Sequence, residues 1–146
     1  MIGFLSKLFG GNKSDKDVKR IQPLIAEINS IYNGLQELSN DQLRGKTREF
    51  RDRIQEHLQQ INDQITAKKQ EAEANDQPEE AIYDAIDQLI KKRDEQIEEI
   101  LEQILPEAFA VIKETARRFK ENTEITSLAT DLDRELSATG KDYIRI

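Results

Sequence analysis

The chain has 146 residues, of which 35% are charged, 36% hydrophobic and 5% aromatic, with no tryptophan. This balance favours long helices with narrow apolar stripes over one thick globular core. The net charge of −7 disfavours nucleic-acid binding, which needs clustered cations against phosphates. Because the chain has no cysteine, disulfides, thiolate metal ligands and a cysteine nucleophile are excluded. We therefore expect an all-α, intracellular protein without a metal centre.

Residues 1–12 are expected to form a short amphipathic segment that ends at a glycine pair. Its candidate membrane contacts are Ile2, Phe4, Leu5, Lys7, Leu8 and Phe9. An apolar face combined with cations is typical of a helix lying on an anionic membrane surface. The alternative is that the same face packs on the protein's own core. The segment is too short, and lacks the cleavage site, for a secretory signal.

Residues 13–55 are expected to form the first two long helices. Apolar residues recur at helical spacing from Val18 to Leu38, interrupted by Pro23, which should kink the helix or delay its start. Ser39 and Gln42 then form a capping box, in which each side chain satisfies a backbone N–H at the other's position. This pattern predicts a helix that starts at residue 40.

Residues 56–104 are expected to complete a helical hairpin. The helix from residue 40 continues to about residue 74, a turn follows, and Pro78 starts a second helix that runs to Pro106. A helix of that length spans roughly 50 Å, so the hairpin should project from the molecule. Its two narrow stripes can bury each other as in a coiled coil.

Residues 105–119 are expected to form a separate helix whose first turn begins at Pro106. Phe109, Ile112 and Phe119 lie on one face of it, and no local core is available to cover that face. Within residues 120–146 we expect a short helix near 125–137 that ends at Gly140. The alternating "DYIRI" that follows resembles the start of a strand. A pattern that stops there suggests a truncated protein.

No catalytic constellation is evident. The single histidine, His57, is expected to be a solvated helix residue, because no Glu-x-x-His pair accompanies it. The acidic cluster Asp94, Glu95, Glu98, Glu99 and Glu102 lacks the loop and glycine of a calcium site and is expected to be a solvated face. The chain contains no phosphate-binding loop, so no cofactor is expected in it.

Two stretches go beyond composition. "LSNDQLRGKTREFRDRI" (38–54) and "LPEAFAVIKETARRF" (105–119) resemble the paired N-terminal signatures of the SecA family of protein-translocating ATPases. The matching residues of the first are Leu38, Ser39, Leu43, Lys46, Thr47, Glu49, Phe50 and Arg53. Those of the second are Pro106, Glu107, Ala108, Phe109, Ala110, Val111, Glu114, Arg117 and Arg118. Roughly fifty residues separate the two, more than is usual in the family, as in a Bacteroidetes-like form with a helical insertion.

The resemblance implies that the chain is the N-terminal fragment of a larger α/β RecA-like motor. Residues 13–55 would then be the N-terminal helices of its first nucleotide-binding domain. Phe109, Ile112 and Phe119 would dock on the motor core. The intact protein would use ATP and magnesium, and would act on preproteins with a SecYEG-type channel and acidic phospholipid at the inner face of the plasma membrane. This fragment alone would be inactive, and whether it forms a homodimer stays open. The alternative function is a stand-alone helical-hairpin adaptor that binds a partner through its coiled coil.

Overall fold

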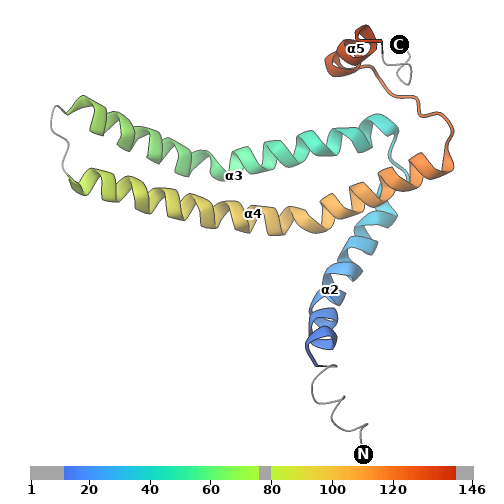
Figure 1. The fold of residues 1–146 in the computed structure, drawn as a ribbon, viewed down its shortest axis with the longest axis horizontal. Helices are drawn as coiled ribbons and strands as arrows, with labels where there is room; N and C mark the ends of the chain where they lie inside the picture. The colour runs from blue at the N-terminus through green and yellow to red at the C-terminus, as the bar shows by residue number, and fades with distance from the viewer. Residues whose placement is uncertain (1–11, 76–79, 141–146) are drawn as a thin grey trace, which may run out of the picture.

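The computed structural model describes residues 12–75 and 80–140. Four helices make up nearly all of this part (Figure 1): α2 (Asn12–Leu35), α3 (Asn40–Ala74), α4 (Glu80–Glu121) and α5 (Asp131–Ala138). No strand occurs within these two ranges, so the all-α expectation is confirmed for them. The amphipathic segment 1–12 falls almost wholly outside the described residues, as do the expected turn at Pro78 and the alternating "DYIRI".

The hairpin is formed by α3 and α4, which lie side by side over most of the length of α3 (Figure 1). Its distal half is held by a cluster of Leu58, Ile61 and Ile65, packed against apolar residues of both arms. The expected limits of the first arm, 40 and 74, are confirmed. Its start is set by the predicted capping box: Ser39 N–H donates to Gln42 Oε1 at 2.8 Å, and Gln42 N–H donates to Ser39 Oγ at 3.2 Å.

The expectation of a new helix at Pro106 was wrong, because α4 continues through Pro106 without a break. A proline inside a helix removes one backbone hydrogen bond and costs about 3 kcal/mol. Here Pro106 is buried, and buried residues flank it at Ile104 and Ala110. Packing on both sides therefore offsets the loss, and the second hairpin arm and the "PEAFA" segment form one rod.

Helix α2 also contains a proline, Pro23, and begins at Asn12, so the proline does not delay its start. Helix α2 projects away from the hairpin, and the C-terminal end of α2 meets α4 (Figure 1). There Leu35 forms a second core cluster with Leu43, Ala110 and Val111. This cluster joins α2, α3 and α4 at the root of the hairpin.

The last helix is shorter than expected and begins at Asp131 rather than near residue 125. Thr130 is its N-cap, and the Asp133 side chain completes a capping box. The preceding residues are not helical because their backbone groups bond to α3: Asn40 Nδ2 donates to the Thr126 carbonyl at 2.8 Å, and Leu128 N–H donates to Asp41 Oδ1 at 2.7 Å. Gly140 follows the helix with φ 76°, a conformation that glycine adopts at little cost.

Candidate functional site

The structure brings the two signature stretches together at the root of the hairpin. Glu107, in the second stretch, accepts from Arg53 Nη1 at 2.6 Å and lies 3.3 Å from Lys46 Nζ, both in the first stretch. Lys46 also pairs with Glu49 at 2.6 Å. All four residues belong to the matching set, and their charges link α3 to α4.

Glu114 is the only fully buried charged side chain of the described part, with an exposed fraction of 0%. Arg117 donates to it through Nη2 at 2.7 Å and Nε at 2.9 Å, and Arg118 donates through Nε at 2.7 Å. These donors, Arg117 first, lower the pKa of the Glu114 carboxyl to about 2, against the opposing effect of burial. The carboxylate is therefore ionised and satisfied inside the protein.

Arg118 uses its remaining donors to hold the turn between α2 and α3. It donates to the carbonyls of Leu35 at 3.2 Å and Leu38 at 2.7 Å, and to Asn40 Oδ1 at 2.8 Å. The last carbonyls of a helix have no partner within the helix, so Arg118 caps the C-terminus of α2. Two groups of residues together form what we name the signature clamp: Glu107 with its partners Lys46 and Arg53, and Glu114 with its partner Arg118.

A further polar contact fixes α2 on α4. Lys113 Nζ donates to Asn29 Oδ1 at 2.7 Å and lies 4.2 Å from the centroid of the Tyr32 ring. A cation over an aromatic face is attracted by the ring's negative potential. No local sequence pattern indicates this contact, because residues 29 and 113 are far apart in the chain and neither lies in a motif that marks a pair.

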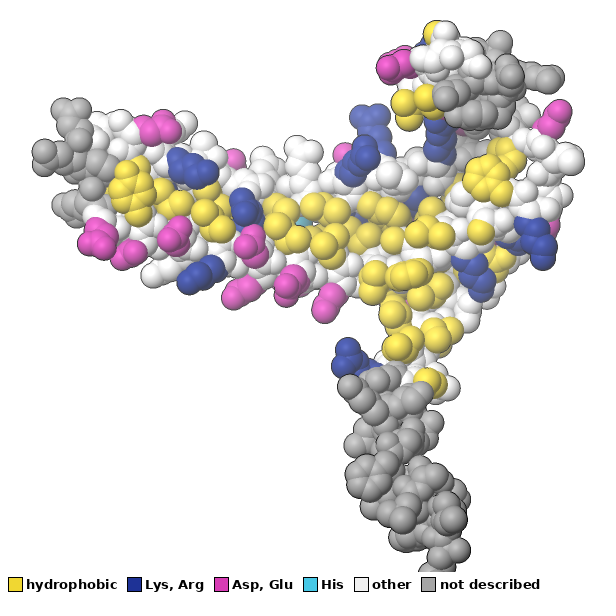
Figure 2. Space-filling model, in the orientation of Figure 1, with side chains coloured by type: hydrophobic (Ala, Val, Ile, Leu, Met, Phe, Trp, Pro, Cys, Tyr) yellow, Lys and Arg dark blue, Asp and Glu magenta, His cyan; other side chains and the backbone are white. Residues whose placement is uncertain are grey.

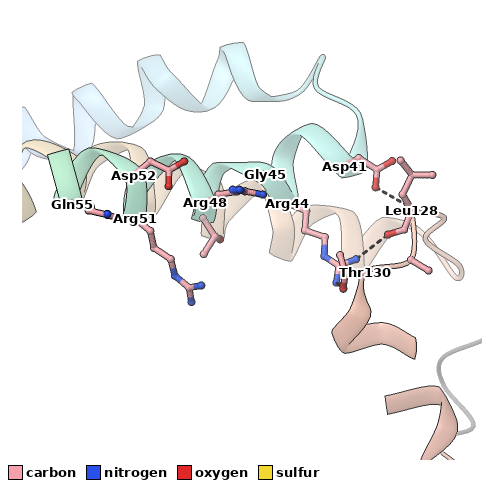
Figure 3. Close-up of a pocket in the computed structure, with 11 residues that line it drawn as sticks. Asp41, Arg44, Gly45, Arg48, Arg51, Asp52, Gln55, Leu128 and Thr130 are labelled. Carbon is pink, nitrogen blue, oxygen red and sulfur yellow. Dashed lines mark hydrogen bonds between the residues drawn. The ribbon is translucent and has the colours of Figure 1, made fainter. Parts of the chain in front are cut away.

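A groove runs between α3 and the segment that follows α4 (Figure 3). Its walls include Arg44, Arg48 and Arg51 of α3 and Thr130 of the following segment. Arg44 Nη1 pairs with Asp133 at 2.7 Å, and the guanidinium also donates to Thr130 Oγ1 at 3.2 Å. The hydrogen bond from Arg44 holds the pKa of the Asp133 carboxyl well below its usual range. These contacts attach the last helix to α3, and the lining residues contain no nucleophile–base pair.

The face expected to dock on a larger core is exposed. Phe109, Ile112 and Phe119 have exposed fractions of 49%, 63% and 70%. Large apolar side chains are seldom left so open in a row on a monomeric protein. Among the described residues, no element covers the open side of Phe109, Ile112 and Phe119. Figure 2 shows that, on the face in view, hydrophobic side chains also line the hairpin and its junction with α2.

The acidic cluster of α4 and His57 are the two remaining candidates for metal or catalytic chemistry. The members of the acidic cluster are exposed along α4, as expected. The expectation that His57 is solvated was wrong for its Nε2 atom, which is buried where α4 packs over α3 and has no hydrogen-bond partner among the described residues. Over residues 12–75 and 80–140 no group of three or more His, Asp or Glu side chains is arranged to hold a metal ion. None of the helices in these ranges combines the length and apolar character needed to cross a membrane.

Known proteins resemble this chain over nearly its whole length. Residues 5–127 match the family model of the SecA DEAD-like domain. Two relatives, each named Protein translocase subunit SecA, are 50% identical (Flavobacterium psychrophilum) and 43% identical (Phocaeicola vulgatus). The alignments cover 99% and 98% of this chain and 13% of each relative. A third, of the same name, from Cytophaga hutchinsonii is 40% identical over 97% of the chain.

No solved structure matches the chain. The chain spans only about an eighth of the length of the curated relatives that it matches. The family model and the relatives nevertheless cover both signature stretches and the hairpin between them, and they give the adaptor alternative no support. The residues that meet in the signature clamp are thus those on which the resemblance rests, and the chain belongs to the SecA DEAD-like domain family.

Proposed function

We propose that the chain is the N-terminal part of an ATP-driven protein translocase and serves there as a structural support. The observation that carries this proposal is the signature clamp. Lys46 and Arg53 meet Glu107, and Arg118 reaches back to the α2–α3 turn, so two stretches separated by the hairpin act as one unit. A unit of this kind holds helices in a defined relative position and performs no chemistry itself.

The support would present Phe109, Ile112 and Phe119 to the motor core of the intact protein. Their exposure agrees with a face that is covered by residues outside the described part. We keep the division expected from the sequence. It comprises a membrane- or channel-contacting segment (1–12), N-terminal helices of the first nucleotide-binding domain (13–55), a hairpin insertion (56–104), a helix docking on the nucleotide-binding domain (105–119) and a linker into the motor core (120–146).

The intact protein would bind ATP and magnesium through residues outside this chain, since no phosphate-binding loop occurs in it. Its partners would be preproteins, a SecYEG-type channel and acidic phospholipid, and its place the cytoplasmic face of the plasma membrane. The relatives' shared name, Protein translocase subunit SecA, supports this assignment. The 146-residue chain by itself would be inactive.

The proposal is tested by measuring ATP hydrolysis and preprotein import into channel-containing vesicles. We expect the intact protein to hydrolyse ATP faster when a preprotein and the vesicles are both present. The 146-residue chain should show no hydrolysis above buffer. An intact protein whose hydrolysis ignores both preprotein and channel would contradict the proposal.

The docking role is tested separately with Phe109→Ala in the intact protein. Truncation of a phenylalanine buried at an interface costs roughly 3–5 kcal/mol, whereas truncation of an exposed one costs little. We therefore expect a clear drop in the melting temperature of the intact protein. Tyr83→Ala is the matched control, because Tyr83 is exposed to 52% on the same helix but lies toward the hairpin tip. Equal effects of the two changes would show that Phe109 is not covered.

A further inference from the structure

The exposed apolar face of α4 does not stop where the docking segment was expected to begin. Leu101 and Leu105, with exposed fractions of 47% and 39%, precede Phe109 and Ile112 at steps of four, four and three residues. At 3.6 residues per turn these steps keep all four side chains on one face of the helix. Because α4 passes through Pro106 unbroken, the face is continuous across residue 105.

The same face changes character abruptly beyond Leu101. Continuing toward the hairpin tip, the positions at helical spacing are Glu98, Asp94, Lys91 and Asp87, all exposed. Charged side chains at these positions favour contact with water. The apolar stretch that contains Leu101 therefore ends between Glu98 and Leu101, inside the hairpin rather than at its root, and charged positions separate it from the exposed Tyr83 near the tip.

We propose that the remainder of this protein's own chain covers α4 as far as Leu101, so that the base of the hairpin insertion is part of the docking surface. This inference rests on the proposed function and extends it. We choose this occupant because of the length of the relatives. The chain covers only 13% of each of them, so the remaining residues are numerous enough to supply an apolar counterpart. A second copy of the chain is the alternative occupant, and the experiment below separates the two.

The proposal has a mechanical consequence. Contact at Leu101 and Leu105 on one face of α4, and the Glu107 ion pairs with Lys46 and Arg53 on α3, would fix both arms near the base of the hairpin. A helix held on both sides of residue 105 cannot swivel there. The hairpin would thus turn together with the core on which it docks, as a rigid arm rather than as a hinged appendage.

The experiment is hydroxyl-radical footprinting of the intact protein, with the oxidation rate of each side chain divided by its rate in the denatured protein. We expect several-fold protection of Leu101 and Leu105, equal to that of Phe109 and Ile112. Tyr83, with a comparable exposed fraction in the 146-residue chain, should show only the modest protection of a half-exposed side chain. The measurement is repeated on dilution to the monomer, which must leave the protection unchanged.

The outcomes separate the two proposals. Protection of Phe109 and Ile112 without Leu101 and Leu105 would overturn this inference and leave the docking proposal standing. Absence of protection at all four would overturn both. Protection that disappears on dilution would assign the face to a second copy and also overturn the inference.

A second measurement does not depend on labelling. Leu101→Ser and Leu105→Ser in the intact protein should each lower the melting temperature, whereas Tyr83→Ser should not. Serine at an exposed helix position has only a small propensity cost, so folding of the hairpin itself is retained. If all three changes behave alike, Leu101 and Leu105 are solvated and the inference is wrong.

Discussion

At the scale of single residues, burial of charge is the most informative feature of this molecule. Glu114 and Arg118 lie in "KETARRF", a stretch that by composition alone is a polar helix end. In the structure Glu114 is fully buried, and Arg118 reaches carbonyls at positions 35 and 38. Arginine suits this task because its planar group presents five donors in fixed directions. Lysine could not make the same set of bonds.

Glu114→Gln should destabilise the protein and alter its response to acid. Removing one charge from a buried pair costs up to about 3–5 kcal/mol. Here Arg118, whose side chain is only 11% exposed, would lose its counter-charge, whereas Arg117 would keep its ion pair with Glu121. The folded-state pKa of about 2 lies below the ordinary value of 4.5, so ionised Glu114 contributes stability in full above pH 4.5. That contribution is lost as the pH falls from 4.5 toward 2, and the variant should lack this part of the decline.

Urea unfolding at a series of pH values measures both effects. Glu98→Gln is the matched control, because Glu98 is an exposed carboxylate on the same helix and should change the unfolding free energy by less than about 0.5 kcal/mol. If the unfolding free energy of the Glu114→Gln variant fell between pH 4.5 and 2 as steeply as that of the parent protein, Glu114 would not be the group that titrates.

At the scale of elements, the hairpin is the part whose two arms bury each other. Leu58, Ile61 and Ile65 of α3 pack with Leu89, Ile90 and Ile97 of α4. The buried atoms His57 Nε2 and Gln96 Oε1 lie in the same stretch without partners among the described residues. Unsatisfied buried polar atoms cost stability but restrict which registers the two arms can adopt. Because the apolar cluster lies wholly between the two arms, we expect the hairpin to fold alone.

A peptide of residues 38–105 should therefore be mostly helical and melt cooperatively. The range includes Ser39 and Gln42, which form the capping box at the start of α3. Circular dichroism over a temperature ramp measures helix content and cooperativity. Ile61→Asn is the companion variant, because Ile61 is exposed to only 3% and a polar group there would be buried. A coil spectrum for the parent peptide would refute an autonomous hairpin.

At the scale of the whole molecule, the described part leaves large apolar side chains exposed on two of its helices, α2 and α4. Val18, Ile21 and Ile25 lie open on α2, with exposed fractions of 48–53%, in addition to the face of α4. The chain as a whole is acidic, with a net charge of −7, whereas Lys7, Lys13, Lys16, Lys19 and Arg20 make its first twenty residues basic. Such a separation of charge would favour the approach of that end to anionic surfaces.

We expect the 146-residue chain to bind vesicles that contain anionic lipid, and a chain lacking residues 1–12 to bind far less. Each cation near an anionic surface contributes about 1 kcal/mol, and salt screens this attraction. Co-flotation with vesicles of neutral or anionic lipid, at low and high salt, is the measurement. Binding that survives the truncation would assign the membrane contact to another part of the chain and not to Ile2, Phe4, Leu5, Lys7, Leu8 and Phe9.

The sequence by itself determined the features that arise from local patterns. Apolar residues at helical spacing predicted the hairpin, and Ser39 with Gln42 predicted the start of α3, because both depend on residues within a few positions of each other. The motif residues predicted the family by resemblance. Helical spacing within residues 105–119 predicted that Phe109, Ile112 and Phe119 form an apolar face without a local partner, and these three side chains are exposed.

Only the tertiary structure decided what depends on residues far apart in the chain. Pro106 does not end α4, because packing at Ile104 and Ala110 outweighs a local rule. His57 Nε2 is buried because another helix covers it, and α5 starts late because Asn40 and Asp41 bond the segment before it. The bonds from Arg118 to Leu35 and Leu38 span about eighty positions. Their free energy arises only once the helices are brought together, and no local pattern of residues encodes it.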